Sequence, residues 1–487
     1  MTPNAAISPF SPALPAMADG GGLAGVLGGS GAAAAPKVLV DHAQGVQRVR
    51  IARQHHGVAV LRRLLRSWGY EDERAAQCGY KLGSPEAGET WALARGKAQR
   101  CGRLSCGSAK VCAVCHDTRA IVRAAAVSVA VWRWLEADDE HSAVFVSVTP
   151  GHQTGDRLDL AHDRLMEARE AVMHPQRSGW RRFRREHGVR DVLWVAEHTV
   201  GVNGPHAQLH LVFLLDREWD AIDADRAHAQ LWVAFRAELD RLGHTGGWGA
   251  DRAIDVRPVV DGPGLAAYVA KIGLGAEVTG LSGKDAKAEG SIAYLAIPAR
   301  LAELCGRRDP ERVAQRNPEV ARLLADLREY ADLVYSPRER GRRWWKNFAG
   351  LRKLVPELAD LEGQGLAGAA LAAAVVDLLP ADVRPDIAAP ANDAPAGVLH
   401  VDQDSWQAAS EAWWHARGCP DGWWQLLWRL LPGIVHRGWV DLGLVVGWLI
   451  EDHGLEAAAD AIAQLAGAAA TETEHGWTVT WTRGTPR

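Results

Sequence analysis

The chain has 487 residues and a mass of 52.6 kDa, with 55 Lys and Arg residues against 59 Asp and Glu residues and a formal net charge of -4. This charge excludes a uniformly basic protein that coats DNA. The composition, 47% hydrophobic and 23% charged, is typical of a globular protein of two to four domains. No apolar run approaches the ~18 residues that span a bilayer. We therefore expect a cytoplasmic protein with no membrane partner.

The N-terminal segment, residues 1–36, is rich in Gly, Ala and Pro and lacks the positively charged leading region of a secretory signal peptide. Such a composition cannot bury a core, so we expect a disordered tail. Apolar residues at helical spacing among arginines then predict an amphipathic helix over 42–70.

Seven cysteines are present, and four of them fall within fifteen residues, at Cys101, Cys106, Cys112 and Cys115. A C-x-x-C pair with two further cysteines close by favours a structural zinc site with four thiolate ligands. His116 or Cys78 is an alternative for one ligand. The other interpretation is a set of buried free thiols. We expect residues 37–116 to form a helical, cysteine-rich, zinc-binding segment.

The middle of the chain alternates helical and strand patterns. The hydrophobic periodicity predicts helices over 117–135, 160–187 and 223–242, strands over 142–150, 192–200, 206–215 and 255–260, and a helix from Asp261 to Gly273. Gly201-Val202-Asn203-Gly204 is a strong signal for a hairpin between two of the strands. The fold class expected is therefore α+β, with a mostly antiparallel sheet, flanking helices and a domain spanning 117–360.

The C-terminal part differs in charge. Residues 300–358 have helical, basic patterns, and 380–398 contain four prolines, as a linker does. Residues 399–487 carry eleven acidic residues and five arginines, a local charge of -6, and ten of the 21 tryptophans. We expect a separate small domain there, with a host helicase, a polymerase or a second copy as its partner.

Polar residues gather on the predicted hairpin. If it turns at 201–204, Glu197 lies opposite Gln208; a two-residue turn at Asn203-Gly204 would instead place His210 opposite Glu197. In either register His206, Gln208, His210 and Glu197 share one sheet face, because side chains alternate with period two. They form either a half-exposed polar surface or a site for Mn²⁺ or Mg²⁺, since nitrogen and oxygen ligands suit such ions.

A possible nucleophile follows in GLAAYVAKIG. Tyr268 and Lys271 are three residues apart and therefore lie on one helix face. Tyrosine can form covalent intermediates, and a neighbouring cation stabilises its phenolate. The alternative is a tyrosine packed in the core with a lysine that reaches solvent.

Two segments are locally basic. Residues 177–190 contain six arginines and one acid, and 338–353 contain arginines and lysines around Trp344-Trp345. Arginines neutralise phosphates and aromatic rings stack on unpaired bases, so both segments are candidates for DNA contact, or else solvated helix faces. The candidate DNA-binding residues are Arg181, Arg182, Arg184, Arg185, Arg342, Arg343, Trp344 and Lys346.

The order of these motifs, SAVFVSVTPG, then E-x-T-x-G-x-N-G-x-H-x-Q-x-H, then AAYVAKI, resembles the HUH endonucleases. The similarity over roughly 95–358 is to replication initiators of rolling-circle plasmids from high-GC Gram-positive bacteria. It extends into REYADLVYSPRERGRRWWKNFAGLRKLV and leaves out the N-terminal tail and 380–487.

The resemblance implies a bacterial enzyme that nicks one strand of a plasmid origin. Tyr268 would be the nucleophile, supported by Lys271, and the products would be a 5′-phosphotyrosine and a 3′-OH primer. The polar hairpin residues would hold the divalent metal.

The chain departs from this family at Gln208, where relatives have a histidine, and it has no Glu or second Tyr one turn before Tyr268. Alternatives are an HUH relaxase or transposase, or a zinc-stabilised DNA-binding regulator that does not cleave.

Overall fold

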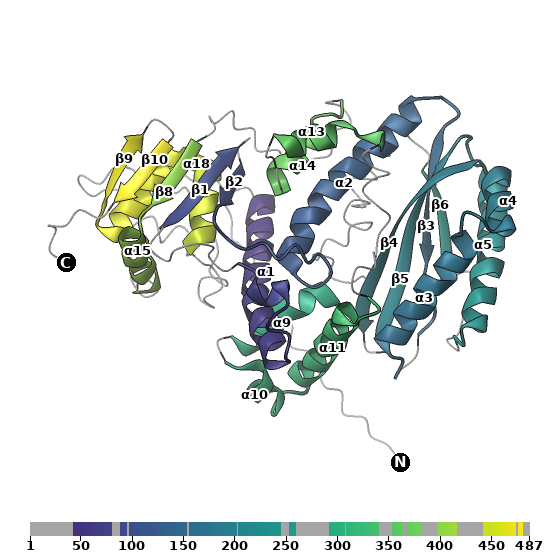
Figure 1. Cartoon of the computed structure of the whole chain (residues 1–487), viewed down its shortest axis with the longest axis horizontal. Helices are drawn as coiled ribbons and strands as arrows, with labels where there is room; N and C mark the ends of the chain where they lie inside the picture. Colours follow the sequence, from purple (N-terminus) through teal and green to yellow (C-terminus); the bar gives the residue numbers. More distant parts are fainter. Residues whose placement is uncertain are drawn as a thin grey trace, which may run out of the picture. The chain divides into compact units, whose positions relative to one another are not determined.

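We describe the fold from a computed structural model (Figure 1). Residues from Val40 onward form one compact unit. The described residues are 42–79, 88–94, 97–152, 155–201, 203–244, 253–259, 292–306, 308–339, 353–364, 366, 368–380, 397–415, 442–473 and 476–480. The expected tail and nearly all of the expected linker lie outside these ranges.

The first sheet has five antiparallel strands in the order β6-β3-β5-β4-β7. The strands are β3 (Ser142–Val148), β4 (Val189–Gly201), β5 (Gly204–Leu215), β6 (Ile254–Val259) and β7 (Ile292–Ala293). The β4-β5 hairpin turns at Gly201–Gly204, and Glu197 lies opposite Gln208. This is the first of the two registers that the sequence allowed. The expected mixture of helices with a mostly antiparallel sheet is thereby confirmed.

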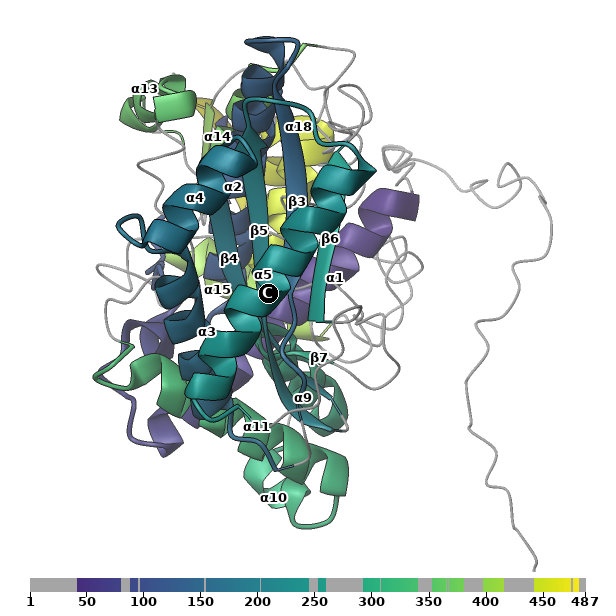
Figure 2. The ribbon, with the colours of Figure 1, turned by 90° about the vertical axis from the view of Figure 1, so that its right-hand side faces the viewer.

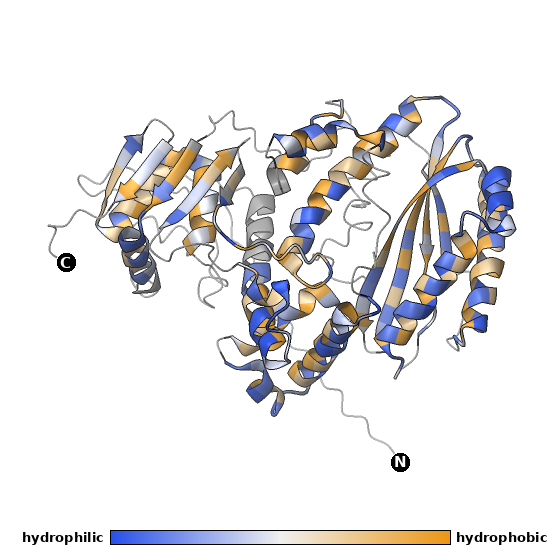
Figure 3. Ribbon diagram, in the orientation of Figure 1, coloured by the Kyte–Doolittle hydropathy of each residue, from blue (hydrophilic) through white to orange (hydrophobic). Residues whose placement is uncertain are grey.

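Helices cover both faces of this sheet. Helices α3 (Leu158–Met173), α4 (Ser178–Glu186) and α5 (Ala221–Arg241) lie across one face, as Figure 2 shows, over a core that includes Leu209, Leu211 and Phe213. Helices α2 (Ala113–Glu136) and α14 (Gly368–Val376) pack against Val212 and Leu214 on the other face. Hydrophilic and hydrophobic positions alternate along α3 and α5 (Figure 3). The polar residues of the hairpin therefore continue the face that α2 and α14 cover farther along β5.

The expected helical stretch over 160–187 contains two separate helices. Within it, α3 ends at Met173 and α4 begins at Ser178. His174 is extended, with ψ of 128°. Pro175 explains the break, because proline lacks an N–H and disfavours the helical conformation of the preceding residue.

The second sheet combines distant parts of the chain. Its order is β2-β1-β8-β10-β9, and the strands are β1 (Glu89–Ala94), β2 (Lys97–Arg100), β8 (Gly397–Val401), β9 (Ala469–Thr473) and β10 (Gly476–Thr480). Helices α15 (Gln403–His415) and α18 (Leu442–Ala466) share its core with Trp91 and Leu399. Within the described ranges, the strands and helices of the segment 399–487 therefore share a sheet and a core with 89–100.

A further helical core surrounds the cysteines. It contains side chains from α1 (His42–Ser67), η2 (Arg74–Gln77), α9 (Ile297–Cys305) and α11 (Pro318–Tyr335). The remaining short helices are η4 (Tyr294–Ala296), α10 (Pro310–Ala314) and α13 (Glu357–Gly363). None of the helices in the described ranges is long and apolar enough to cross a membrane.

Candidate metal centre and polar sheet face

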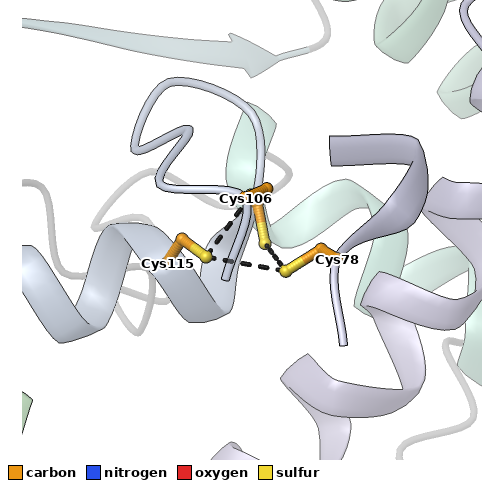
Figure 4. A group of neighbouring side chains, drawn as sticks. Cys78, Cys106 and Cys115 are labelled. Carbon is orange, nitrogen blue, oxygen red and sulfur yellow. Dashed lines mark hydrogen bonds between the residues drawn. The ribbon is translucent and has the colours of Figure 1, made fainter. Parts of the chain in front are cut away.

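Four buried cysteines converge in the helical core: Cys78, Cys106, Cys112 and Cys115, here called the cysteine cluster. Their sulfur atoms all lie within 4.8 Å of one another. The Sγ–Sγ distances are 3.3 Å for Cys106–Cys115 and 3.6 Å for Cys78–Cys115 and Cys78–Cys112. Figure 4 shows Cys78, Cys106 and Cys115 approaching from separate segments.

Local geometry explains how these sulfurs meet. Cys112 is the N-cap of α2 and Cys115 lies in its first turn, so the C-x-x-C pair wraps around a helix start. The amide of Gly79 donates to the carbonyl of Leu104 (2.7 Å), which brings the end of η2 beside the loop that precedes Cys106. Arg62 holds the carbonyl of Cys78 at 2.7 Å, and the amide of Ser108 donates to the sulfur of Cys106 at 3.4 Å.

The electrostatics favour negative charge on part of the cluster. Hydrogen bonds from Cys106, Cys112 and Cys78 lower the pKa of Cys115, and hydrogen bonds from Cys106 and Cys112 lower that of Cys78. The amino-terminal end of α2 also stabilises a thiolate at Cys115. Anionic sulfur in a buried site needs a positive partner.

The cluster fits zinc. Zn–S bonds of about 2.3 Å in a tetrahedron put the sulfurs about 3.8 Å apart, a few tenths of an ångström from the distances found here. The sequence predicted Cys106, Cys112 and Cys115 in this role. The fourth residue is Cys78, the alternative, and not Cys101, whose amide bonds to the Thr90 carbonyl (2.7 Å) as an extension of the β1-β2 ladder.

The hairpin positions the second candidate site, here called the polar row: Glu197, His206, Gln208 and His210. Nε2 of His210 lies 2.7 Å from Oε2 of Glu197 and its Nδ1 lies 3.0 Å from Oγ of Ser147 on β3. Nε2 of Gln208 lies 3.1 Å from Nδ1 of His206. The row is thus arranged as two hydrogen-bonded pairs. Within the described ranges, two groups bring the ligand atoms of three or more His, Cys, Asp or Glu residues within 4.8 Å of one another, and the polar row is not one of them.

His206 is kept neutral. Burial, and then the neighbouring His152, lower its pKa to about 4. The His152 ring lies 4.5 Å from that of His206 between centroids. At neutral pH, His206 therefore retains a lone pair that can accept a hydrogen bond or bind a metal.

The second converging group lies behind β4 and was not foreseen. Nδ1 of His162 is 2.9 Å from Nε2 of His198, and Nε2 of His162 is 3.3 Å from Oε2 of Glu339. Lys110, from the loop between Cys106 and Cys112, donates to the carbonyl of Glu339 at 3.1 Å. Asp163, which completes this group, pairs with Arg338. The carboxylates already face cations, so the group ties the cysteine loop to α3 and β4. His198 follows Glu197 on β4, so its side chain points to the other face of the sheet. Its partner, His162, is 36 residues away in the sequence and could not be inferred from this alternation.

The basic helix α4 divides the predicted DNA-binding arginines. Arg181, Arg182 and Arg185 are exposed, while Trp180 and Phe183 pack inward. Arg184 differs from them, because its guanidinium donates to the carbonyls of Val189 (2.9 Å) and Arg190 and so joins α4 to β4. The remaining predicted residues lie outside the described ranges; they are Tyr268, Lys271, Arg342, Arg343, Trp344 and Lys346.

No family model matches this chain, and neither the curated proteins nor the solved structures provide a significant match.

Proposed function

We propose that the protein is a rolling-circle replication initiator that nicks one DNA strand through Tyr268. The observation that carries the proposal is the polar row on β5, the middle strand of an antiparallel sheet, with Glu197 of β4 in register beside it. The motif order that resembles the HUH endonucleases supports the same function.

The strands place the ends of the segment that contains Tyr268. The segment leaves β6 at Val259, and it rejoins the sheet at Ile292, which pairs with Val200 of β4. The next residue, Ala293, pairs with Thr199, which lies opposite His206. The segment therefore returns to the sheet beside the polar row.

The chemistry is a transesterification. The oxygen of Tyr268 gives up its proton and attacks the phosphorus, the bond from phosphorus to the 3′ oxygen breaks, and that oxygen takes a proton. The products are a 5′-phosphotyrosine and a free 3′-OH. Lys271, three residues from Tyr268 in the sequence, would stabilise the phenolate. One phosphodiester bond replaces another and none is hydrolysed, so the reaction can run in reverse and rejoin the strand.

The donor atoms of the polar row suit a hard divalent cation. His210, Glu197, Gln208 and neutral His206 offer imidazole nitrogen, carboxylate oxygen and amide oxygen, the donors that Mn²⁺ accepts. If the hydrogen bond between His210 and Glu197 is broken, Nε2 of His210 and Oε2 of Glu197 each become available as a metal ligand. Such an ion supplies charge neutralisation at a phosphate. Ser147 holds the other nitrogen of His210 and so fixes its ring orientation.

Covalent labelling tests the nuclease. The full chain is incubated with Mn²⁺ and a random single-stranded DNA library that is labelled at the 3′ end. We expect label to transfer to the protein, because the tyrosine retains the 5′ phosphate of the downstream fragment. The Tyr268→Phe variant should give no adduct, whereas Tyr70→Phe, a matched change in the helical core, should retain it. An adduct that survives Tyr268→Phe refutes the nucleophile.

One observation favours a second candidate, a zinc-stabilised DNA-binding regulator without cleavage. His210 and Glu197 satisfy each other at 2.7 Å, and the position between His206 and His210 is the glutamine Gln208. DNA binding without any adduct in Mn²⁺ would support this candidate. Recovery of the adduct in Gln208→His would support an initiator whose metal affinity has been weakened.

A further inference from the structure

A cavity of about 230 Å³ opens at the end of the β4-β5 hairpin, on the side of α3 and α5. Its wall includes Pro205 from β5, Leu160 and Arg164 from α3, and His244, which follows α5. His152, after β3, also lines it. Strand β5 therefore contributes residues to both the pocket and the polar row.

The pocket presents an available cation. Within the described ranges no hydrogen bond or ion pair engages the Arg164 guanidinium, although the residue lines the cavity. Asp156 and His244 add a carboxylate and an imidazole to the same wall. Burial, and then the charge of Arg164, lower the pKa of His244, which favours a neutral ring there.

The chemistry of the wall matches a nucleotide. Flat imidazole and proline surfaces can stack on a base, a carboxylate and a neutral imidazole can meet donors and acceptors on its edge, and a guanidinium suits phosphate. The volume lies below the ~300 Å³ at which pockets for drug-sized ligands begin. It therefore suits one base with its sugar, and not a folded peptide or a dinucleotide.

The pocket adjoins the polar row through the contact between two histidine rings, which are tilted by 33°. The His152 ring belongs to the pocket wall and lies 4.5 Å from that of His206. On β5, Pro205 and Ala207 line the pocket and alternate with His206, which faces the polar row. A strand that crosses the hairpin tip could thus place consecutive nucleotides at the two sites.

We propose that this pocket receives one unpaired nucleotide of the DNA strand next to the phosphate held at the polar row. The proposal rests on the proposed function for the strand, but it concerns binding and not cleavage. The pocket would then contribute to the choice of sequence at one position, since only one base is enclosed.

A double-mutant cycle tests the base. The full chain binds single-stranded oligonucleotides that carry one abasic site, moved along the strand, and affinity is measured by fluorescence anisotropy without divalent metal. When the abasic site is at the position that enters the pocket, we expect the affinity to fall about tenfold. Ala161→Phe, which fills the pocket from α3, should cost the intact strand a similar factor and cancel the abasic penalty. Ala221→Phe makes the same change at an exposed position at the start of α5, outside the pocket wall, and should change neither affinity.

The charge is tested separately. Arg164→Met should weaken binding about fivefold and lower the salt dependence by about one phosphate contact. Arg226→Met, an exposed change on α5, is the control. Photocrosslinking from 5-iododeoxyuridine at the sensitive position should label the peptides that contain His152 or His244.

The outcomes separate the two proposals. The pocket proposal is overturned if the affinity losses from the abasic site and from Ala161→Phe are additive, or if the crosslinks form at peptides without His152 or His244. Neither result bears on nicking, which the adduct assay tests separately. A coupled penalty in a protein that gives no adduct supports the pocket and contradicts the nuclease. A chain that binds no single-stranded DNA contradicts both.

Discussion

The clearest perturbation is a matched pair of changes, Cys78→Ser and Cys101→Ser. The sequence favours Cys101 as the fourth zinc ligand, whereas the structure places Cys78 in the cluster. Serine is nearly isosteric but stays protonated at neutral pH, so it cannot replace a thiolate ligand. The two variants therefore separate the two sets of ligands with the same chemical change.

The expected magnitude follows from the geometry. The sulfurs lie at 3.3–3.6 Å, and zinc needs about 3.8 Å, so binding requires little rearrangement. Structural sites bind zinc with about 10 kcal/mol or more at neutral pH. At free zinc 100-fold above the dissociation constant, binding adds about 2.7 kcal/mol to the free energy of unfolding. This is a large part of the roughly 5–15 kcal/mol of a typical protein.

The assay is zinc content after dialysis, followed by competition with a chelator and thermal unfolding. The parent chain and Cys101→Ser should retain one zinc per chain and lose stability on chelation. Cys78→Ser should bind zinc at least about 100-fold more weakly and respond little to chelator. Cobalt substitution should show about one quarter less thiolate-to-metal absorption in Cys78→Ser. Zinc retained by Cys78→Ser and lost by Cys101→Ser would refute the assignment.

Three further changes test the fold. Trp91→Ala should cost about 3–5 kcal/mol in denaturant unfolding, because Trp91 is 1% exposed and donates to the Gly443 carbonyl at 3.3 Å; a cost below 1 kcal/mol would contradict the shared core. Gly476→Ala should cost at least about 2 kcal/mol, because its φ is +142° and a Cβ would overlap the Val398 carbonyl, whereas Gly447→Ala in open space on α18 should be neutral or stabilising. Burial lowers the pKa of His187, so in mild acid the unfolded chain binds a proton that the folded chain does not, and stability falls as pH drops through the ordinary histidine range. His187→Asn should make this slope shallower by at most about 1.4 kcal/mol per pH unit, and an unchanged slope would contradict a neutral, buried His187.

The local patterns of the sequence predict the first sheet well. The hairpin with Gly201 and Gly204 is recognisable in the sequence because a turn with Asn-Gly between two alternating strand patterns is typical of a β-hairpin. The common face of the polar row followed from strand periodicity alone, and the structure selects the register that pairs Glu197 with Gln208. These features depend on residues that are close in sequence.

The rest depends on contacts that spacing does not encode. Cys78 is 28 residues from Cys106 and enters the cluster only because the end of η2 bonds to the Leu104 carbonyl through Gly79. His162 and His198 meet because α3 packs across the back of β4. Arg184 resembled its exposed neighbours in sequence, and the carbonyls that it caps are visible only in three dimensions.

The pairing of β1 with β8 has a consequence for how the ends of the chain fold. Strands β8, β9 and β10 supply three of the five strands of the second sheet, and Glu89 pairs with Val401 across more than 300 residues. Strands β8 and β10 are parallel, so the chain between them must cross over, and it does so through α15 and α18. Neither β1-β2 nor 397–480 can bury Trp91 and Leu399 without the other, because both side chains are in one core. Truncation at residue 396 should therefore expose Trp91 and weaken the N-terminal segment as well, which distinguishes this arrangement from an independent C-terminal domain.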